Sequence, residues 1–435
     1  MASVLEARIG TRKKSSPHVK KMRVADLFCG AGGASCGLRD AGMEVVLGID
    51  ADAGALGVYR ANHAHRAVQM DLGEVEAAVE AIRAAGPIDV LAGSPPCTDF
   101  STAGGRVERE THAGLTVCFV KIAVALRVRG VLLENVPELV HSSAWAEARA
   151  MLLGAGYSVV VLRVNAAACG VAQVRRRVFA IAVLGGDVEA MRRLQRTAAS
   201  YNRTPSDAKT VRECLEDRSA DTYWYCGRNK MAACVRSTEE PAATLRTNCL
   251  LPPPPQYMAR HDDRGDVAHV HVLTVGEVAA IASFPSGYFE AMTRTAAAKY
   301  IGNCVPPRME AVVARWCMEL LSHPPVASVP QYLFTVRRHT THTSRIQRLT
   351  NAGLLGTGAT LDPKGCLRYQ GGGAGDAIVQ RVLGFALPSD CTLVLTPRTK
   401  PSISIGKAPL DDLHLLKRGY AQPFGSMQQL QRVCG

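Results

Sequence analysis

Cys97 is the residue whose type and position most directly indicate chemistry. It follows Pro95 and Pro96 at the end of an apolar run, residues 88–92, that predicts a short buried strand. Proline lacks a backbone donor and fixes φ, so the strand ends there. Cys97 is therefore expected at a carboxyl edge of the sheet, where open α/β sheets bind ligands. A thiolate there is a nucleophile, although a lone cysteine is more often an inert, buried apolar side chain.

A glycine-rich turn follows the first apolar run, and its sequence is Phe28-Cys29-Gly30-Ala31-Gly32-Gly33. Glycine permits a tight turn and close approach of a ligand to the backbone. Asp50, at the end of the next run, can accept hydrogen bonds from a ribose hydroxyl pair. The glycine order departs from the dinucleotide pattern G-x-G-x-x-G, which favours S-adenosylmethionine over NAD. An ordinary structural turn is the competing interpretation.

Further charged residues follow other predicted strands. Asp71 suits either an adenine amino group or a helix cap. Glu134 shares the sheet edge with Cys97, where a carboxyl group can do acid catalysis. Arg175 and Arg177 alternate onto one face if the strand after them begins early, so that two guanidinium groups point together. Each feature alone suits a turn or a solvated patch, but their combination favours a catalytic site.

The elements that position these residues alternate between short apolar strands and helical stretches from residue 22 to about 185. This alternation is typical of a doubly wound α/β domain with a mainly parallel sheet. Ligands are expected at one edge of that sheet. The expected strands span residues 23–28, 45–49, 67–69, 88–92, 131–133, 158–164 and 178–183.

The remaining chain divides by composition. Residues 1–21 form a basic tail, interpreted as a solvated segment with a nuclear address or phosphate contact as the alternative. Interleaved arginines and tyrosines mark residues 186–270 as an insertion. Residues 271–325 contain two expected helices, 274–284 and 307–321, that return to the first domain. Residues 326–435 form an extension of unknown role, whose part from residue 331 holds thirteen basic and five acidic residues.

The whole chain of 435 residues carries a formal net charge of +13, which favours a polyanionic partner such as nucleic acid. Lysine and arginine interrupt the longest apolar stretch, so no membrane span is expected. The fourteen cysteines include no C-x-x-C pair, and the start lacks an apolar signal core. These features predict an intracellular protein, in cytoplasm or nucleus, with reduced thiols and no metal.

Six segments, in order, resemble the motifs of the cytosine-5 DNA methyltransferases. They are Phe28 to Gly33, Pro95-Pro96-Cys97, Glu134-Asn135-Val136, Gln173-x-Arg175-x-Arg177, residues 236–245, and Gly302-Asn303-x-Val305-Pro306. The resemblance covers roughly residues 22–320. It implies the α/β fold of S-adenosylmethionine-dependent methyltransferases, with a small target-recognition insertion and an extra C-terminal segment.

The resemblance also implies a reaction: transfer of a methyl group from S-adenosylmethionine to carbon 5 of cytosine in DNA. Cys97 would attack carbon 6, and Glu134 would hold ring nitrogen 3. Arg177 would contact the base carbonyl and the cysteine side, while Arg175 would brace the site. The cytosine must leave the stack to reach these groups. The segment 102–106 is expected to close over it.

The cofactor residues implied by the resemblance and the glycine turn are Phe28, Gly30, Gly32, Gly33, Asp50, Asp71, Pro95 and Asn303. Thr98 stands where the family more often has glutamine, and Ala172 where it often has proline; neither removes a reacting group. The short insertion argues against an elaborate target site. A tRNA cytosine methyltransferase of the same fold and a catalytically silent DNA-binding regulator are the alternatives, and a monomer is expected.

Overall fold

The computed structural model describes residues 21–96, 110–227 and 233–324, with only the backbone of residues 110–113, and the backbone of five short strands beyond residue 334. Cys97, Thr98 and the expected closing segment 102–106 lie outside the described residues.

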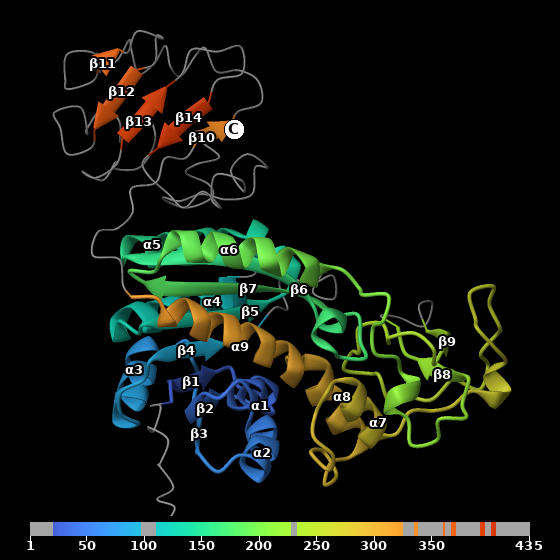
Figure 1. The fold of residues 1–435 in the computed structure, drawn as a ribbon. Helices are drawn as coiled ribbons and strands as arrows, with labels where there is room; N and C mark the ends of the chain where they lie inside the picture. Colours follow the sequence, from blue (N-terminus) through green and yellow to red (C-terminus); the bar gives the residue numbers. More distant parts are fainter. Residues whose placement is uncertain are drawn as a thin grey trace, which may run out of the picture.

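A seven-stranded sheet forms the centre of the molecule, in the order β3-β2-β1-β4-β5-β7-β6 (Figure 1). Strands β1 to β5 run parallel, whereas β7 is antiparallel to both of its neighbours. Each expected strand is present, and the prediction of a doubly wound, mainly parallel sheet is confirmed. The strands are β1 (Arg23–Leu27), β2 (Glu44–Asp50), β3 (Arg66–Gln69), β4 (Val90–Gly93), β5 (Gly130–Asn135), β6 (Tyr157–Asn165) and β7 (Arg176–Leu184).

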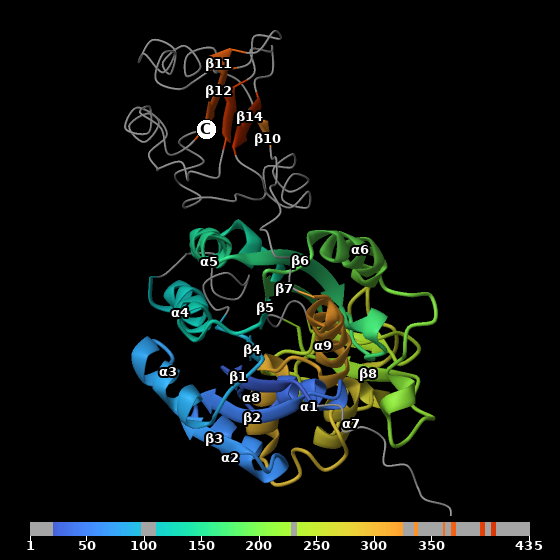
Figure 2. The ribbon, with the colours of Figure 1, turned by 60° about the vertical axis from the view of Figure 1, so that its left-hand side comes forward.

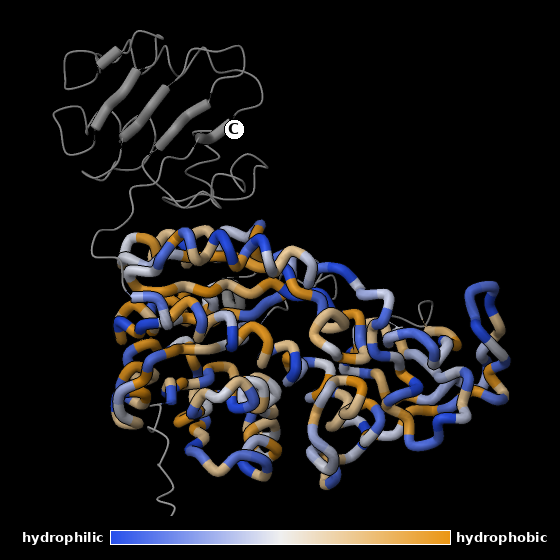
Figure 3. Tube along the Cα trace, viewed as in Figure 1, coloured by the Kyte–Doolittle hydropathy of each residue, from blue (hydrophilic) through white to orange (hydrophobic). Residues whose placement is uncertain are grey.

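Helices cover both faces of the sheet (Figure 2). One face packs against α3 (Val75–Ala84), α4 (Glu110–Leu126) and α5 (Ser143–Gly154). The other packs against α1 (Gly33–Asp40), α6 (Val188–Ala198) and α9 (Pro307–Ser322). Because both faces are covered, the strands read as nearly continuous apolar runs, which Figure 3 shows as hydrophobic segments between the helices. Helix α2 (Ala53–Asn62) packs beside β3.

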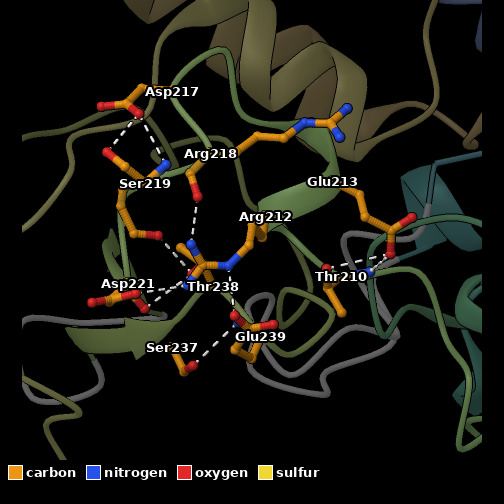
Figure 4. A network of polar contacts seen from close by, with 11 residues as sticks. Thr210, Arg212, Glu213, Asp217, Arg218, Ser219, Asp221, Ser237, Thr238 and Glu239 are labelled. Carbon is orange, nitrogen blue, oxygen red and sulfur yellow. Dashed lines mark hydrogen bonds and ion pairs between the residues drawn. The ribbon is translucent and has the colours of Figure 1, made fainter.

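The insertion expected at residues 186–270 contains an antiparallel pair, β8 (Thr222–Tyr225) and β9 (Cys234–Ser237). The segment that leads into β8 is held by Arg212, shown in Figure 4. Arg212 Nε lies 2.5 Å from Glu239 Oε1, Nη2 lies 2.8 Å from Asp221 Oδ1, and Nη1 donates to the Arg218 carbonyl. One guanidinium therefore joins three parts of the insertion.

Helix α6 lies inside the range expected for recognition, yet it shares an apolar cluster with β6, β7 and α9. We therefore propose that the recognition region begins after Ala198. The described short 3-10 helices are η1 (Pro137–His141), η2 (Ala166–Cys169), η3 (Ala199–Asn202), η4 (Arg212–Cys214) and η6 (Val267–His269).

The chain then returns to the sheet domain through α7 (Val275–Ile281), α8 (Arg294–Asn303) and α9. Thr274 and Glu277 form a reciprocal capping box at the start of α7. The two helices expected in this part are present as α7 and α9, whereas α8 was not expected from the sequence. It matters because it carries Asn303 to the sheet edge.

The C-terminal extension contains a five-stranded sheet in the order β10-β14-β13-β12-β11, with every pairing antiparallel. Its strands are β10 (Thr335–Arg337), β11 (Thr360–Leu361), β12 (Leu367–Gln370), β13 (Thr392–Leu395) and β14 (Ser402–Ile405). Among the helices that the structure describes, none is long and apolar enough to cross a membrane.

Candidate active site

A cavity of about 1380 Å³ opens at the carboxyl ends of β1, β2, β4 and β5. The insertion and the return segment, residues 271–325, complete its walls. The volume exceeds the usual 300–1,000 Å³ of a small-molecule site, so it has room for more than one ligand group. Of the residues expected from the sequence, those that line it are Phe28, Gly30, Gly33, Asp50, Asp71, Pro95, Glu134, Arg175, Arg177 and Asn303.

The glycines of the first turn have different tasks. Gly30 has a φ of +52°, and a Cβ added to it would meet nothing within 4 Å, so its backbone borders open space in the cavity. Gly32 does not line the cavity; a Cβ there would lie 2.3 Å from His63 Nε2. A Cβ on Gly33 would lie 2.3 Å from the Val305 carbonyl oxygen. Gly32 and Gly33 thus permit close packing, and Gly30 is the one that leaves room for a ligand.

This division predicts different outcomes for two matched substitutions. Gly33→Ala should reduce the free energy of unfolding by about 2–3 kcal/mol, because a backbone oxygen of the return segment must move. Gly30→Ala should cost about 1 kcal/mol of backbone strain and mainly weaken cofactor binding. Thermal melts and calorimetric titration with S-adenosylmethionine separate the effects. Equal destabilisation by the two variants would contradict the division.

Asp50 is the last residue of β2, and its carboxylate holds the glycine-rich turn that follows β1. Its Oδ2 accepts a hydrogen bond from Gly30 N at 2.8 Å, and its Oδ1 accepts one from Asp52 N at 2.8 Å. Burial raises the pKa of Asp50, while these backbone donors act in the opposite direction. Each carboxylate oxygen retains capacity for a second donor. Asp50 therefore holds the glycine turn and still presents acceptor oxygens to the cavity.

Asp71 lies in the turn between β3 and α3. Its Oδ1 accepts a hydrogen bond from Gly73 N at 2.9 Å, which closes a local turn. Helix α3 is capped at Glu74, without a side-chain hydrogen bond, so Asp71 is not its cap. The same residue also lines the cavity, together with Met70, Leu72 and Leu115. A carboxylate beside three apolar side chains is suited to bind a flat ring that carries a polar group. Asp71 remains a predicted cofactor contact.

Glu134, near the end of β5, is paired with Arg177 on the adjacent strand β7. Arg177 Nε lies 3.0 Å from Glu134 Oε1, and the two side chains are 14% and 10% exposed. Arg177 Nη1 also donates to the Arg176 carbonyl at 2.8 Å. The next residue, Asn135, donates from Nδ2 to the Pro95 carbonyl at 3.0 Å. The end of β5 thus holds both the Glu134–Arg177 ion pair and the start of the segment that contains Cys97.

Arg175 contacts other parts of the chain. It is 3% exposed, and its Nη1 donates to the carbonyls of Gly302 at 3.0 Å and Leu245 at 3.4 Å. Gln173 Oε1 accepts a hydrogen bond from Leu245 N at 3.1 Å. Both arginines line the cavity, and their described hydrogen bonds give them different tasks. Arg175 braces the recognition and return segments, and Arg177 holds Glu134.

Several lining residues were not assigned to the site from the sequence. On the insertion they are Tyr223, Tyr225, Arg246 and Asn248, and on α8 they are Lys299 and Tyr300. Lys299 Nζ lies 2.7 Å from Asp52 Oδ2, which lowers the pKa of Asp52. Arg236, within a recognised motif, lies over the Tyr225 ring at 5.8 Å. Interleaving of arginine and tyrosine was the available signal, but it does not indicate which members face the cavity.

Comparison with known proteins agrees with this geometry. Residues 22–247 match the family described as C-5 cytosine-specific DNA methylase. The chain belongs to the C-5 cytosine-specific DNA methylase family. It is therefore a DNA cytosine methyltransferase, as the order of the six motifs predicted.

Named relatives of this methyltransferase are type II enzymes. It is 33% identical to the type II methyltransferase M.HgiDI of Herpetosiphon aurantiacus over 70% of this chain and 96% of that relative. It is 31% identical to M.HindV of Haemophilus influenzae over 67% of this chain and 95% of that relative.

Solved structures share the fold of the methyltransferase. The S. pombe Dnmt2 methyltransferase is similar with a TM-score of 0.53 at 17% identity, covering 70% of this chain and all of that chain. A putative DNA modification methyltransferase encoded within an E. coli prophage gives a TM-score of 0.52 at 20% identity, with the same coverage.

Proposed function

We propose that this DNA cytosine methyltransferase modifies carbon 5 of a cytosine extruded from DNA, with S-adenosylmethionine as methyl donor and Cys97 as nucleophile. The observation that carries the proposal is the Glu134–Arg177 pair in the cavity, beside the anchored Pro95 that begins the Cys97 segment. The named relatives support a type II modification enzyme that acts inside the cell, where its DNA lies.

The residues at the sheet edge fit the proposed cofactor. Gly30 leaves open space, Asp50 and Asp71 supply acceptor oxygens, and Phe28 contributes an aromatic wall. Asn303, at the end of α8, would contact the methionine part. When bound, S-adenosylmethionine supplies an electrophilic methyl group on a sulfonium centre.

The described groups suit the chemistry that cytosine requires. Carbon 5 is a weak nucleophile until the Cys97 thiolate adds to carbon 6, forming a C–S bond and moving π electrons towards carbon 5 and ring nitrogen 3. We propose that the carboxyl group of Glu134 holds a proton at nitrogen 3, oriented by Arg177 on Oε1. Carbon 5 would then take the methyl group as the methyl–sulfur bond breaks and leaves a neutral thioether. Loss of the carbon 5 proton to a base and departure of the thiolate would restore the ring.

Incubation with methyl-labelled S-adenosylmethionine and an equal mixture of mixed-sequence DNA and tRNA tests the proposal. Label is expected in DNA at cytosine, and bisulfite sequencing of that DNA identifies the target. Label in tRNA alone would mean that tRNA, and not DNA, is the substrate. Cofactor binding without label in either polymer would favour a silent DNA-binding regulator.

A further inference from the structure

A chain of short hydrogen bonds lies beneath the glycine turn and plays no part in the proposed chemistry. Ser35 Oγ donates to Asp26 Oδ2 at 2.7 Å and lies 2.6 Å from Tyr59 Oη, which lies 2.6 Å from His65 Nε2. Asp26, Ser35 and Tyr59 are completely buried. His65 is partly exposed. The chain therefore joins a buried carboxyl group in β1 to a side chain that reaches solvent.

The fold makes room for this chain at a specific place. A Cβ on Gly48, in the interior of β2, would lie 2.5 Å from Tyr59 Oη. Glycine inside a strand weakens it unless another group approaches closely, and here that group is the phenol. Asp26 pairs with Gly48 on β2 and Ala92 on β4, in the middle of the sheet. It stands two residues before Phe28, which lines the cavity.

The chain has two self-consistent hydrogen-bond orders. With Asp26 ionised, Ser35 donates to it, Tyr59 donates to Ser35, and His65 Nε2–H donates to Tyr59. With Asp26 protonated, every bond reverses and His65 Nε2 becomes an acceptor. The order with Asp26 protonated holds one more proton, which His65 Nδ1 takes from solvent. As it does so, the Nε2 proton passes to Tyr59, the Tyr59 proton to Ser35 and the Ser35 proton to Asp26.

Charged and buried groups on the neighbouring elements affect the protonation of Asp26 and His65, the two ends of the hydrogen-bond chain. Burial, and then the charge of Asp50 on β2, raise the pKa of Asp26 to about 7, against the effect of the Ser35 hydrogen bond. Glu310, buried on α9, and Cys29 in the turn interact electrostatically with Asp26. Burial and Arg39 on α1 lower the pKa of His65. The cluster around Asp26 is therefore acidic, without a described cation beside its carboxyl group.

We propose that Asp26 is a proton-dependent positioning residue that makes the cavity discriminate between S-adenosylmethionine and its demethylated product, S-adenosylhomocysteine. This inference rests on the proposed cofactor. The methyl donor carries a sulfonium charge that the product lacks, so an ionised carboxylate beneath the turn attracts the donor and not the product. The Ser35–Tyr59–His65 chain stabilises that carboxylate and exchanges its proton with solvent.

Calorimetric titration of the full-length protein with each of the two ligands, from about pH 6 to pH 8, tests the proposal. The preference for S-adenosylmethionine should rise about three- to tenfold as Asp26 ionises. Below the midpoint of this pH dependence, binding of the methyl donor should release protons. The release is measured from the dependence of the binding heat on the buffer. Asp26→Asn, which retains an acceptor for Ser35, should make the preference independent of pH.

Tyr59→Phe keeps the ring but removes the link to His65, and should move the midpoint to higher pH because the ionised carboxylate loses support. Tyr288→Phe is the matched control. Its buried hydroxyl contacts His63 and the Ala31 carbonyl, outside the chain, so the midpoint should not move.

A wild-type preference that does not change with pH would overturn the inference, as would an unchanged pH profile in Asp26→Asn. If Asp26→Asn does not fold, wild-type proton release and the Tyr59→Phe midpoint decide between the outcomes. Failure to bind either ligand at any pH would instead refute the proposed cofactor.

Discussion

Cys97→Ser is expected to abolish methyl transfer while leaving the affinity for S-adenosylmethionine within about twofold of the wild type. A serine hydroxyl is scarcely ionised at neutral pH and adds poorly to an aromatic ring, so the rate should fall by roughly 10⁴-fold or more. The proposed cofactor end of the cavity is lined by the glycine turn, Asp50 and Asp71, which the substitution leaves unchanged.

The matched control is Cys118→Ser on α4, which replaces a partly exposed thiol that does not line the cavity. It should retain wild-type activity. DNA containing 5-fluorocytosine provides a second measurement, because a fluorine at carbon 5 cannot leave as a proton and the adduct accumulates. The wild type and the control should form a covalent complex that resists denaturation, and Cys97→Ser should not. Turnover by Cys97→Ser near the wild-type rate would refute the assigned nucleophile.

The sheet was predictable because its strands are buried on both faces. Strands β4 and β5 have buried residues at every position, so their apolar runs are continuous and end at recognisable breaks. Parallel order then places the residues after those breaks at one edge. Glu134, Asp50 and Pro95 could be assigned to one site on this basis, and the structure brings them to one cavity.

The partners of these residues were harder to predict because they come from distant parts of the chain. Arg175 contacts the Gly302 carbonyl across a separation of 127 residues, and Lys299 contacts Asp52 across 247. Sequence pattern indicates residue type and face, but not which backbone carbonyl a guanidinium will reach. Helix α8 was missed because most of its side chains are small or polar. Its packing depends on alanines that lie in the same apolar cluster as α7.

The glycine turn shows the same limit at a single motif. Pattern alone gave Gly30, Gly32 and Gly33 one common task, close approach of a ligand. The structure separates them, because His63 and the Val305 carbonyl fill the space beside Gly32 and Gly33. His63 directly follows α2 and Val305 lies in the return segment, so only the tertiary arrangement distinguishes a packing glycine from a ligand-facing one.

Glu134→Gln is the second substitution with a large expected effect. Glutamine keeps the shape and an acceptor oxygen for Arg177 Nε, but it has no carboxyl proton to hold at ring nitrogen 3. Loss of positioned acid catalysis typically costs 10²–10⁴-fold, so the single-turnover rate should fall by about that factor with little change in DNA affinity. Arg177→Met should lower the rate similarly, because the carboxyl group loses its orienting partner 3.0 Å away.

The double variant distinguishes a functional pair from two separate contacts. Residues that act as a unit are strongly non-additive, so Glu134→Gln with Arg177→Met should be little slower than the slower single variant. Arg175→Met is the matched control from the same motif. Because Arg175 holds the Leu245 and Gly302 carbonyls, its loss should lower thermal stability and combine additively with Glu134→Gln. Additive losses for Glu134 and Arg177 would mean that the arginine does not act through the carboxyl group, and the proposed proton placement at nitrogen 3 would need another orienting group.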